Sequence, residues 1–350
     1  MVNKIFLGLL LFVPLSIIAK ALHATPILIF TISAIAIIPL AKYIGEATEE
    51  LAAYSGPAVG GLLNATFGNA TELIIGMLAL QAGLIEVVKA SLTGSIIANL
   101  LLVLGLAIFF GGYKNEDQTF SSIGAKAGAS TLLLASVSLV IPAMFVITSP
   151  GVSSERVWHL SIIVAILMII AYIGSLVFTL KTHRHLYMKD IAEVEDGRWT
   201  KKKSFLVLFT STIIVAYISE ILVSTIRPLV LTFGWTELFI GVVFIAIIGN
   251  VTEHISAITA AVKNKLDLSI QIAIGSSTQI VMFVAPVLVI TSLFLSHPMN
   301  LIFQTFELVA IIFSVFIANS VIEDGKSHWY EGLQLLVTYA IIAVAFYIHP

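Results

Sequence analysis

The sequence predicts an all-α, polytopic membrane protein with about 11 transmembrane helices, arranged as one leading helix and two inverted five-helix repeats. Three observations predict this fold class. Of the 350 residues, 59% are hydrophobic and only 11% are charged, and the mean hydropathy is +1.05, which lies outside the usual range of soluble domains. Apolar runs of spanning length recur along the chain. One glutamate-containing motif occurs twice.

Apolar runs of roughly 20 residues, the length that crosses a hydrocarbon core, define the individual spans. The first run resembles a secretory signal peptide, because Lys4 precedes an apolar stretch that ends in Ala19-Lys20-Ala21. We expect this leading segment, residues 1–23, to be retained as a spanning helix. The expected spans are 4–20, 25–43, 59–82, 87–111, 121–147, 156–181, 203–226, 236–262, 268–293, 299–321 and 329–348.

The distribution of lysine and arginine predicts the orientation, because short cytoplasmic loops are enriched in these residues. With the N-terminus in the cytoplasm, Lys20, Lys89, Arg156 and Arg227 fall on the external side, and the other fourteen of the 18 basic residues fall on the cytoplasmic side. We therefore expect a cytoplasmic N-terminus and an external C-terminus. The net charge of −2 suggests no nucleic-acid partner, and the absence of cysteine excludes disulfides and thiolate chemistry.

The glutamate motif belongs to a longer internal repeat. GNATELIIG begins at Gly68, and GNVTEHISA begins at Gly249. A Gly-Ser pair follows each motif at the same interval, since 94 − 68 = 26 and 275 − 249 = 26. Upstream, YIGE at 43–46 is echoed by YISE at 217–220. The two copies therefore predict two related halves of the chain.

Each half contains five of the expected spans. We assign the first repeat to residues 24–181, a cytoplasmic linker to 182–202 and the second repeat to 203–350. Because five is odd, the second repeat must enter the membrane from the side opposite to the first. Inverted repeats of this kind are typical of secondary transporters, in which the ion site lies near the bilayer midplane where the repeats meet.

Each motif offers a carboxylate and an amide for binding a cation. Asn69 and Glu72 are three residues apart, as are Asn250 and Glu253, so each pair shares one face of a helix. The preceding glycine lets the backbone open, which frees carbonyl oxygens as further ligands. Hard oxygen ligands of this kind suit Ca²⁺. A charged side chain inside a membrane is costly and usually marks a transport pathway, which favours a functional role for both glutamates.

Other polar residues have competing explanations. For Ser95, Asn99 and Ser276 taken singly, helix packing through hydrogen bonds is the stronger explanation, although together with Gln279 they could complete a polar cavity. His254 is either a hydrogen-bonding prop or a proton relay. The remaining candidates lie at expected helix ends, where a solvated surface competes with a vestibule that attracts cations; they are Glu46, Glu49, Glu50 and Glu220.

These motifs resemble the Ca²⁺/H⁺ exchanger, or cation/proton exchanger, family of the calcium/cation antiporter superfamily. The resemblance covers essentially the whole chain. It is carried by GNATELIIG, VVKASLTGSIIANLLLVLG (87–105), GNVTEHISAITAAVKNKLDLSI (249–270) and AIGSSTQIVMF (273–283).

The resemblance implies that Glu72 and Glu253 bind either the metal or protons. It also implies that Asn69 and Asn250, with Ser95, Ser276, Asn99 and Gln279, support the site. The helices that carry Glu46 and Glu220 resemble the elements that open one side or the other. Sodium/calcium relatives carry a Thr-Ser-Leu-Pro-Glu type motif that is absent here, which favours protons as counter-ion. The short linker of mixed charge departs from the acidic linkers of many eukaryotic members and suggests a prokaryotic plasma membrane.

The function implied is Ca²⁺ export by alternating access, with Ca²⁺ and H⁺ as transported substrates, no cofactor, and membrane lipid as surroundings. Exchange of another cation such as Mn²⁺, coupling to Na⁺, and a passive channel remain alternatives. A membrane-embedded enzyme is disfavoured, because Glu253-His254 lacks the second histidine of a zinc-protease motif and the chain lacks Asp-rich runs. The sequence leaves open whether the chain forms a homo-oligomer.

The predicted orientation can be tested with single cysteines, because the chain contains none. Cysteines placed at Lys114, Lys189 and Lys326 should react with a membrane-impermeant reagent only after cells are permeabilised. Labelling of any of the three from outside intact cells would contradict the orientation.

Overall fold

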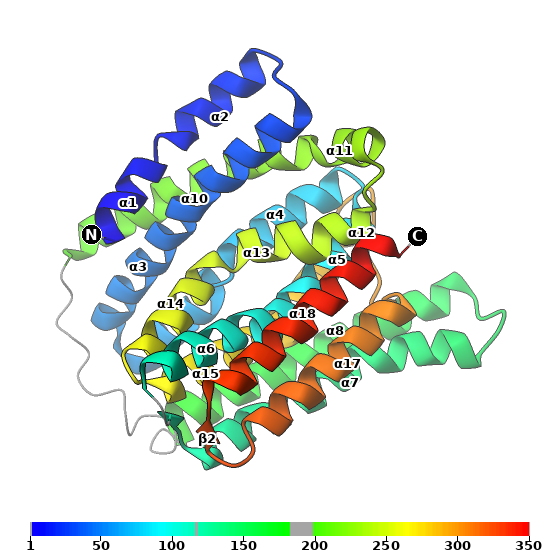
Figure 1. Cartoon of the computed structure of the whole chain (residues 1–350). Helices are drawn as coiled ribbons and strands as arrows, with labels where there is room; N and C mark the ends of the chain where they lie inside the picture. The colour runs from blue at the N-terminus through cyan, green and yellow to red at the C-terminus, as the bar shows by residue number, and fades with distance from the viewer. Residues whose placement is uncertain (1, 116–117, 183–198, 350) are drawn as a thin grey trace. The chain divides into compact units, whose positions relative to one another are not determined.

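The computed structural model describes residues 2–115, 118–182 and 199–349 (Figure 1). Eight helices of this part are long and apolar enough to cross a membrane, or nine if the bent pair Glu237–Gly249 and Val251–Val262 is one span. Two shorter apolar helices, Ala70–Gln81 and Thr305–Val321, fall in the remaining expected spans. Every expected span therefore contains a helix, and the all-α membrane fold class is confirmed.

The elements follow the expected order along the chain. The α-helices are α1 (Val2–Leu9), α2 (Phe12–Ala21), α3 (Pro26–Phe67), α4 (Ala70–Gln81), α5 (Ile85–Ile97), α6 (Leu104–Lys114), α7 (Ser122–Thr148), α8 (Ser154–Val177), α10 (Lys201–Ser224), α11 (Ile226–Phe233), α12 (Glu237–Phe239), α13 (Ala246–Gly249), α14 (Val251–Val262), α15 (Leu266–Gln279), α16 (Ala285–Ser292), α17 (Thr305–Val321) and α18 (Trp329–Ile348). Four π-helical segments are η1 (Ala98–Val103), η2 (Phe178–Thr182), η3 (Ile240–Ile245) and η4 (Ile280–Val284). The strands β1 (Gln118–Thr119) and β2 (Lys326–Ser327) pair antiparallel.

The leading span is divided into α1 and α2 at Leu10 and Leu11. Pro14 lies in the first turn of α2, where its missing N–H is tolerated. Further inside a continuous helix the same proline would remove a hydrogen bond and clash with the carbonyl of Leu10. The position of the proline therefore explains why the chain starts a new helix here.

The expected boundaries of the second and third spans, 25–43 and 59–82, are wrong. Helix α3 continues without interruption to Phe67 over 42 residues, so it is about 63 Å long, roughly twice the thickness of a hydrocarbon core. The third span begins only with α4 at Ala70. The polar stretch after Lys42 does not end the helix because it contains good helix formers such as Glu46, Ala47 and Glu49.

The described residues form two compact units, and each unit takes helices from both halves of the sequence. The first unit comprises residues in the ranges Met1–Leu84, Ile173–Glu237 and Ile248–Thr252. Within it, α3 and α10 pack against each other along much of their length (Figure 1). Ile44 of α3 and Ile221 of α10 are buried in this unit. These two helices carry the matched YIGE and YISE sequences.

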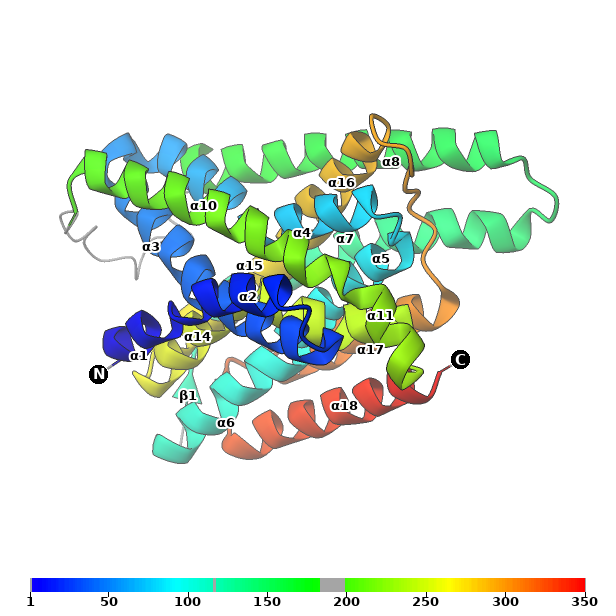
Figure 2. The same ribbon diagram turned by 90° about the horizontal axis from the view of Figure 1, so that it is seen from above.

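The second unit comprises residues in the ranges Ile85–Tyr172, Leu238–Ile247 and Glu253–Pro350. Helix α5 packs against η3, α15 and α17 pack against α7, and α6 lies alongside α18 (Figure 2). The core contains a run of fully buried residues of α5, η1 and α6; they are Ile96, Ile97, Leu100, Leu101 and Leu104. Such burial on several faces explains why this span is so apolar.

Two of the π-helical segments occupy matching places in the repeat. η1 starts 30 residues after Gly68, since 98 − 68 = 30, and η4 starts 31 residues after Gly249, since 280 − 249 = 31. Single π-turns inside α-helices are frequently found at functional sites. The repeated position therefore draws attention to the spans that follow the two glutamate motifs.

Two glycines let α5 and η3 approach each other backbone to backbone. A Cβ at Gly94 would overlap the backbone of Val242, and a Cβ at Gly241 would lie 2.7 Å from the carbonyl oxygen of Val87. Small residues at such contacts are a general device for packing helices in membranes. Neither contact can be relieved by a change of side-chain rotamer at Val242 or Val87, because the clashing atoms belong to the backbone.

We expect Gly94→Ala to destabilise the protein by about 1–3 kcal/mol, the usual cost of overpacking. The measurement is the thermal unfolding midpoint of the purified protein in detergent. Gly174→Ala is the matched control, because a Cβ at Gly174 meets no heavy atom within 4 Å. A Gly94→Ala midpoint no lower than that of Gly174→Ala would refute the proposed backbone contact.

Candidate functional site

The helices break at both Gly-Asn pairs. Helix α3 ends at Phe67 and α4 begins at Ala70, and Asn69 between them has φ −104° and ψ 20°. In the second copy α13 ends at Gly249 and α14 begins at Val251, with a bend of 62° between the two helical segments. The prediction that the Gly-Asn pairs interrupt membrane helices is thus confirmed.

Each glutamate of the motifs is the third residue of the helix that follows the break. Glu72 lies in the first turn of α4, and Glu253 lies in the first turn of α14. Free backbone N–H groups and the positive end of the helix dipole favour a carboxylate at this place. The glutamates are therefore positioned by the helix starts themselves.

The two asparagines stand at the helix starts. Asn69 and Asn250 lie at the breaks, immediately before α4 and α14, and not inside a helix. The physical reason is that asparagine and glycine are poor in helix interiors, since the asparagine amide competes for backbone hydrogen bonds and glycine is too free. Both asparagines are buried.

The first unit brings the first glutamate to the second motif. A Cβ at Gly249 would lie 3.0 Å from Cγ and 3.5 Å from Cδ of Glu72. The Glu72 side chain therefore runs along the bare backbone next to the buried Asn250. In the same unit a Cβ at Gly45 would lie 3.0 Å from Cγ2 of Thr252, so the YIGE segment of α3 also reaches the second motif.

The second unit joins two of the predicted supporting residues. Asn99 Nδ2 donates a hydrogen bond of 3.0 Å to Ser276 Oγ, and both side chains are buried. Asn99 belongs to η1 and Ser276 to α15, so the bond links the matched spans of the two halves. Ser95 is buried one turn before Asn99, and Gln279 is the half-buried last residue of α15 before η4.

Glu253 and His254 start the part of α14 that belongs to the second unit. His254 is buried, and among the described residues its Nε2 atom has no hydrogen-bond partner. One expectation was that His254 supports the site through a hydrogen bond. Its Nε2 atom makes no such bond to the described residues. Among the residues that the structure describes, no group of three or more His, Asp or Glu side chains gathers as a metal site. Binding of a cation at the two motifs would therefore use amide, hydroxyl and carbonyl oxygens as ligands, together with few carboxylates.

The predicted vestibule residues are placed differently from one another. Glu46 lies within the continuous α3, where it pairs with Lys42, so its expected position at a helix end is wrong. Glu220 is exposed near the end of α10. Glu50 Oε2 accepts a 3.0 Å hydrogen bond from the backbone N–H of Trp199. Most of the predicted linker, including Glu193, lies outside the described residues.

Two buried charged residues were not identified as candidates from the sequence. Lys89, which was assigned to the external side, is buried in α5 and donates to Asn300 Oδ1 and the carbonyl of Ile302. Glu307, buried in α17, accepts a hydrogen bond from Thr93. Each stands inside or beside an apolar run, and an ionisable residue in such a run is the signal that could have singled them out.

Known proteins resemble this chain over nearly its whole length. The family described as sodium/calcium exchanger protein matches residues 25–181 and 203–348. The Ca²⁺/H⁺ antiporter of Aphanothece halophytica is 46% identical, with 99% of this chain and 97% of the relative covered. The Ca²⁺/H⁺ antiporter ChaA of Bacillus subtilis (strain 168) is 47% identical, with 99% of both chains covered.

Solved structures show the same fold. Native YfkE superposes with a TM-score of 0.86 at 45% identity, covering 98% of this chain and 99% of that chain. The H⁺/Ca²⁺ exchanger CAX superposes with a TM-score of 0.71 at 14% identity, over 99% of this chain and 92% of that chain, and so supports the fold alone. With its two broken helices, its repeated motifs and a family match over most of its length, the chain belongs to the sodium/calcium exchanger protein family.

Proposed function

We propose that the chain is a secondary active antiporter that exchanges Ca²⁺ for H⁺ by alternating access, with Glu72 and Glu253 binding either the metal or protons. The observation that carries this proposal is the pair of helix breaks, each followed by a glutamate in the first turn of the next helix. Relatives named Ca²⁺/H⁺ antiporter, 46% and 47% identical over nearly the whole chain, support the substrate pair.

The chemistry of exchange follows from using the same carboxylates for both ions. Burial in a low-dielectric site favours the protonated form of a carboxyl group, whereas a bound divalent cation favours the ionised form. Glu72 and Glu253 therefore hold protons or Ca²⁺ in alternation. Two ionised carboxylates without a cation would be like charges in low dielectric, so the bare site resists the change between inward-open and outward-open states. This resistance makes exchange obligatory.

The breaks and the neighbouring amides supply the remaining ligands. Asn69 and Asn250 add amide oxygens, and the interrupted backbone adds carbonyl oxygens. Ser95, Asn99, Ser276 and Gln279 line the adjacent polar region in this proposal. The pairing of Asn99 with Ser276 supports that assignment, because it holds polar side chains of two matched spans together.

The proposed architecture gives the transport a direction. The family match to two separate stretches supports the division into repeats at 24–181 and 203–350, joined by the linker at 182–202. With a cytoplasmic N-terminus, proton entry down the usual gradient drives Ca²⁺ out of the cytoplasm. Full-length relatives from Bacillus subtilis and Aphanothece halophytica support a prokaryotic plasma membrane.

Exchange of Ca²⁺ against Na⁺ is the second candidate, because the matched family is described as sodium/calcium exchanger protein. The two candidates are separated with purified protein in liposomes. Under the proposal, an imposed proton gradient drives uptake of radioactive Ca²⁺, and an imposed Na⁺ gradient at equal pH does not. Competition with Mn²⁺ and K⁺ in the same assay defines the cation preference.

Glu72→Gln and Glu253→Gln test the shared-carboxylate mechanism. Glutamine keeps the size and hydrogen-bonding capacity but removes the titratable charge, so a purely structural glutamate should tolerate the change. We expect each variant to insert and fold yet to lose proton-driven Ca²⁺ uptake almost completely. Glu155→Gln, an exposed glutamate also in the first turn of its helix, is the control and should stay active. Near-normal exchange with an unchanged pH profile in either motif variant would rule out the mechanism.

Glu46→Gln and Glu220→Gln test the vestibule assignment. If these residues attract cations without binding them in the site, neutralising either one slows transport modestly and weakens its dependence on ionic strength. The affinity for Ca²⁺, measured by titration of the purified protein, should remain nearly unchanged. Complete loss of Ca²⁺ binding in Glu46→Gln would mean that the metal site includes α3.

A further inference from the structure

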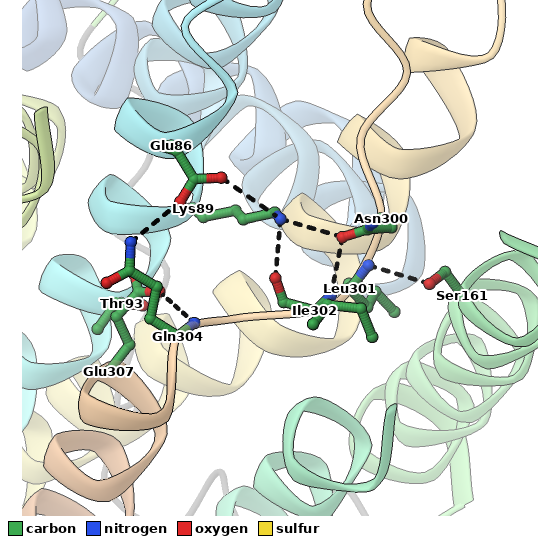
Figure 3. Close-up of polar contacts among 9 residues, drawn as sticks. All are labelled: Glu86, Lys89, Thr93, Ser161, Asn300, Leu301, Ile302, Gln304 and Glu307. Carbon is green, nitrogen blue, oxygen red and sulfur yellow. Dashed lines mark hydrogen bonds and ion pairs between the residues drawn. The ribbon is translucent and has the colours of Figure 1, made fainter. Parts of the chain in front are cut away.

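A buried polar cluster in the second unit contains none of the residues assigned above to Ca²⁺ (Figure 3). We call it the Lys89–Glu307 cluster. It joins α5, the segment that precedes α17, and the first turn of α17. Its members are Glu86, Lys89, Thr93, Asn300, Gln304 and Glu307. Lys89 is 6% exposed and Glu307 is 0% exposed, whereas Glu86 and Gln304 reach the surface.

The charge of Lys89 is fully accommodated. Its Nζ donates to Asn300 Oδ1 at 3.0 Å and to the carbonyl oxygen of Ile302 at 2.8 Å. Glu86 Oε1 lies 3.7 Å from the same atom and supplies the counter-charge. Two of the three N–H donors of the ammonium group thus have hydrogen-bond acceptors, and Glu86 acts as a counter-charge at longer range. Lys89 and Glu86 therefore form a pair without net charge, and Glu307 does not lie within ion-pair distance of Lys89.

Glu307 has only neutral donors. Its Oε1 accepts 2.9 Å from Thr93 Oγ1, and its Oε2 accepts 2.8 Å from the backbone N–H of Gln304. No ion pair joins it to a basic side chain of the described residues. An ionised carboxylate buried in this way is costly, and ionisable residues inside membrane domains are by default functional candidates.

Helix capping alone does not explain a glutamate at this position. Gln304 and Glu307 form a capping box at the start of α17, but glutamine serves that role as well as glutamate does. A second capping box, His328 with Glu331, starts α18. Glu331 Oε2 accepts from Ser327 Oγ at 2.7 Å and from the backbone N–H of His328 at 3.0 Å, and this glutamate is partly exposed. The two capping boxes share their hydrogen-bond pattern, but the Glu307 side chain is fully buried and the Glu331 side chain is not.

The partners of Glu307 accommodate both of its protonation states. A threonine hydroxyl donates to an ionised carboxylate and accepts from a protonated one. When a proton binds Oε1, the Thr93 hydroxyl turns from donor to acceptor, and no other bond must break. The cluster is then neutral, because Glu86 and Lys89 cancel.

The groups packed around α17 leave few charges to act on Glu307. Helix α5 contributes Glu86 and Lys89, η1 contributes no titratable side chain, α7 contributes Lys126, and α18 contributes Glu331 and three tyrosines. The imidazole of His349 stacks on Phe306, the neighbour of Glu307, at 5.0 Å between ring centroids. Glu86 and Lys89 are the charged members of the Lys89–Glu307 cluster besides Glu307 itself.

We propose that Glu307 is a further proton-binding site of the exchanger, separate from Glu72 and Glu253, and that it takes up and releases a proton in each transport cycle. The proposal rests on the proposed Ca²⁺/H⁺ exchange. Thr93 transmits the change to α5, which carries Ser95 two residues later and continues into η1 with Asn99. On the proposed orientation, α5 and α17 both begin at the external side, from which protons enter.

The test compares two transport modes of the purified full-length protein in liposomes. Proton-driven Ca²⁺ uptake requires proton binding, whereas exchange of unlabelled for radioactive Ca²⁺ at equal pH uses only the metal-loaded states. We expect Glu307→Gln to lower proton-driven uptake by at least about tenfold while Ca²⁺ self-exchange stays within about twofold of wild type. Glu331→Gln, the matched capping-box control, should leave both modes unchanged.

The opposite outcomes overturn the proposal. If both modes are unchanged in Glu307→Gln, the residue only caps α17; if both fall together, its role is structural. Thr93→Val provides a second variant, which removes one of the two donors to the carboxylate and should therefore shift the pH dependence of proton-driven uptake. An unchanged pH dependence counts against the proposed pair.

Infrared spectroscopy separates this proposal from the proposed function. A protonated-carboxyl band that changes with pH in the wild type and is missing from Glu307→Gln supports proton binding at Glu307. Identical spectra of the two proteins overturn it. If the wild type moves Ca²⁺ without moving protons, the proposed exchange fails, and the spectra still decide whether Glu307 binds a proton.

Discussion

The two helix breaks are the constraint on which the polar chemistry of this protein depends. A membrane offers no water to backbone groups that lack partners, so a helix interrupted inside it must satisfy its own ends. In both copies the sequence provides a glycine and an asparagine at the break and a glutamate at the start of the next helix. The interruption thus creates a positive helix end and supplies the carboxylate that belongs beside it.

The spans that follow the breaks extend this arrangement. Each contains a π-helical segment at nearly the same distance from its Gly-Asn pair, and the hydrogen bond between Asn99 and Ser276 connects the two spans. A π-turn shifts the hydrogen-bond register and so changes the direction in which side chains point. Of the four π-helical segments, η1 and η4 therefore lie in the matched spans that contribute Asn99 and Ser276, whereas η2 and η3 lie elsewhere.

The sequence was a good guide to the spans and to the paired motifs because both depend on local pattern. Hydropathy identified every region that contains a membrane helix, and the glycine and asparagine identified the breaks. It could not identify the end of α3, because a run of good helix formers after Lys42 continues a helix whether or not lipid surrounds it. The expected helix boundary near residue 43 relied on polarity, which sets the depth in the membrane and does not determine the backbone conformation.

The buried charges were missed for a different reason. Lys89 and its acceptor Asn300 are 211 positions apart, and Glu307 and Thr93 are 214 positions apart. From the sequence, a lysine near the start of an apolar run is assigned to a loop, because its hydrogen-bond partners in a distant segment cannot be identified. Likewise, the contact of Glu72 with Gly249 depends on the packing of the first unit and has no local signal. Tertiary pairing, and not propensity, determines these features.

The glycine contacts between α5 and η3 also have a mechanical consequence. Backbone atoms in direct contact cannot slip past each other by a change of side-chain rotamer, so Gly94 and Gly241 lock the two segments in one register. A force applied to α5 is therefore passed on to η3 and along the continuous helix into α13, as far as Gly249. Asn250 is the first residue beyond that stretch, and it lies at the 62° bend between the two helical segments.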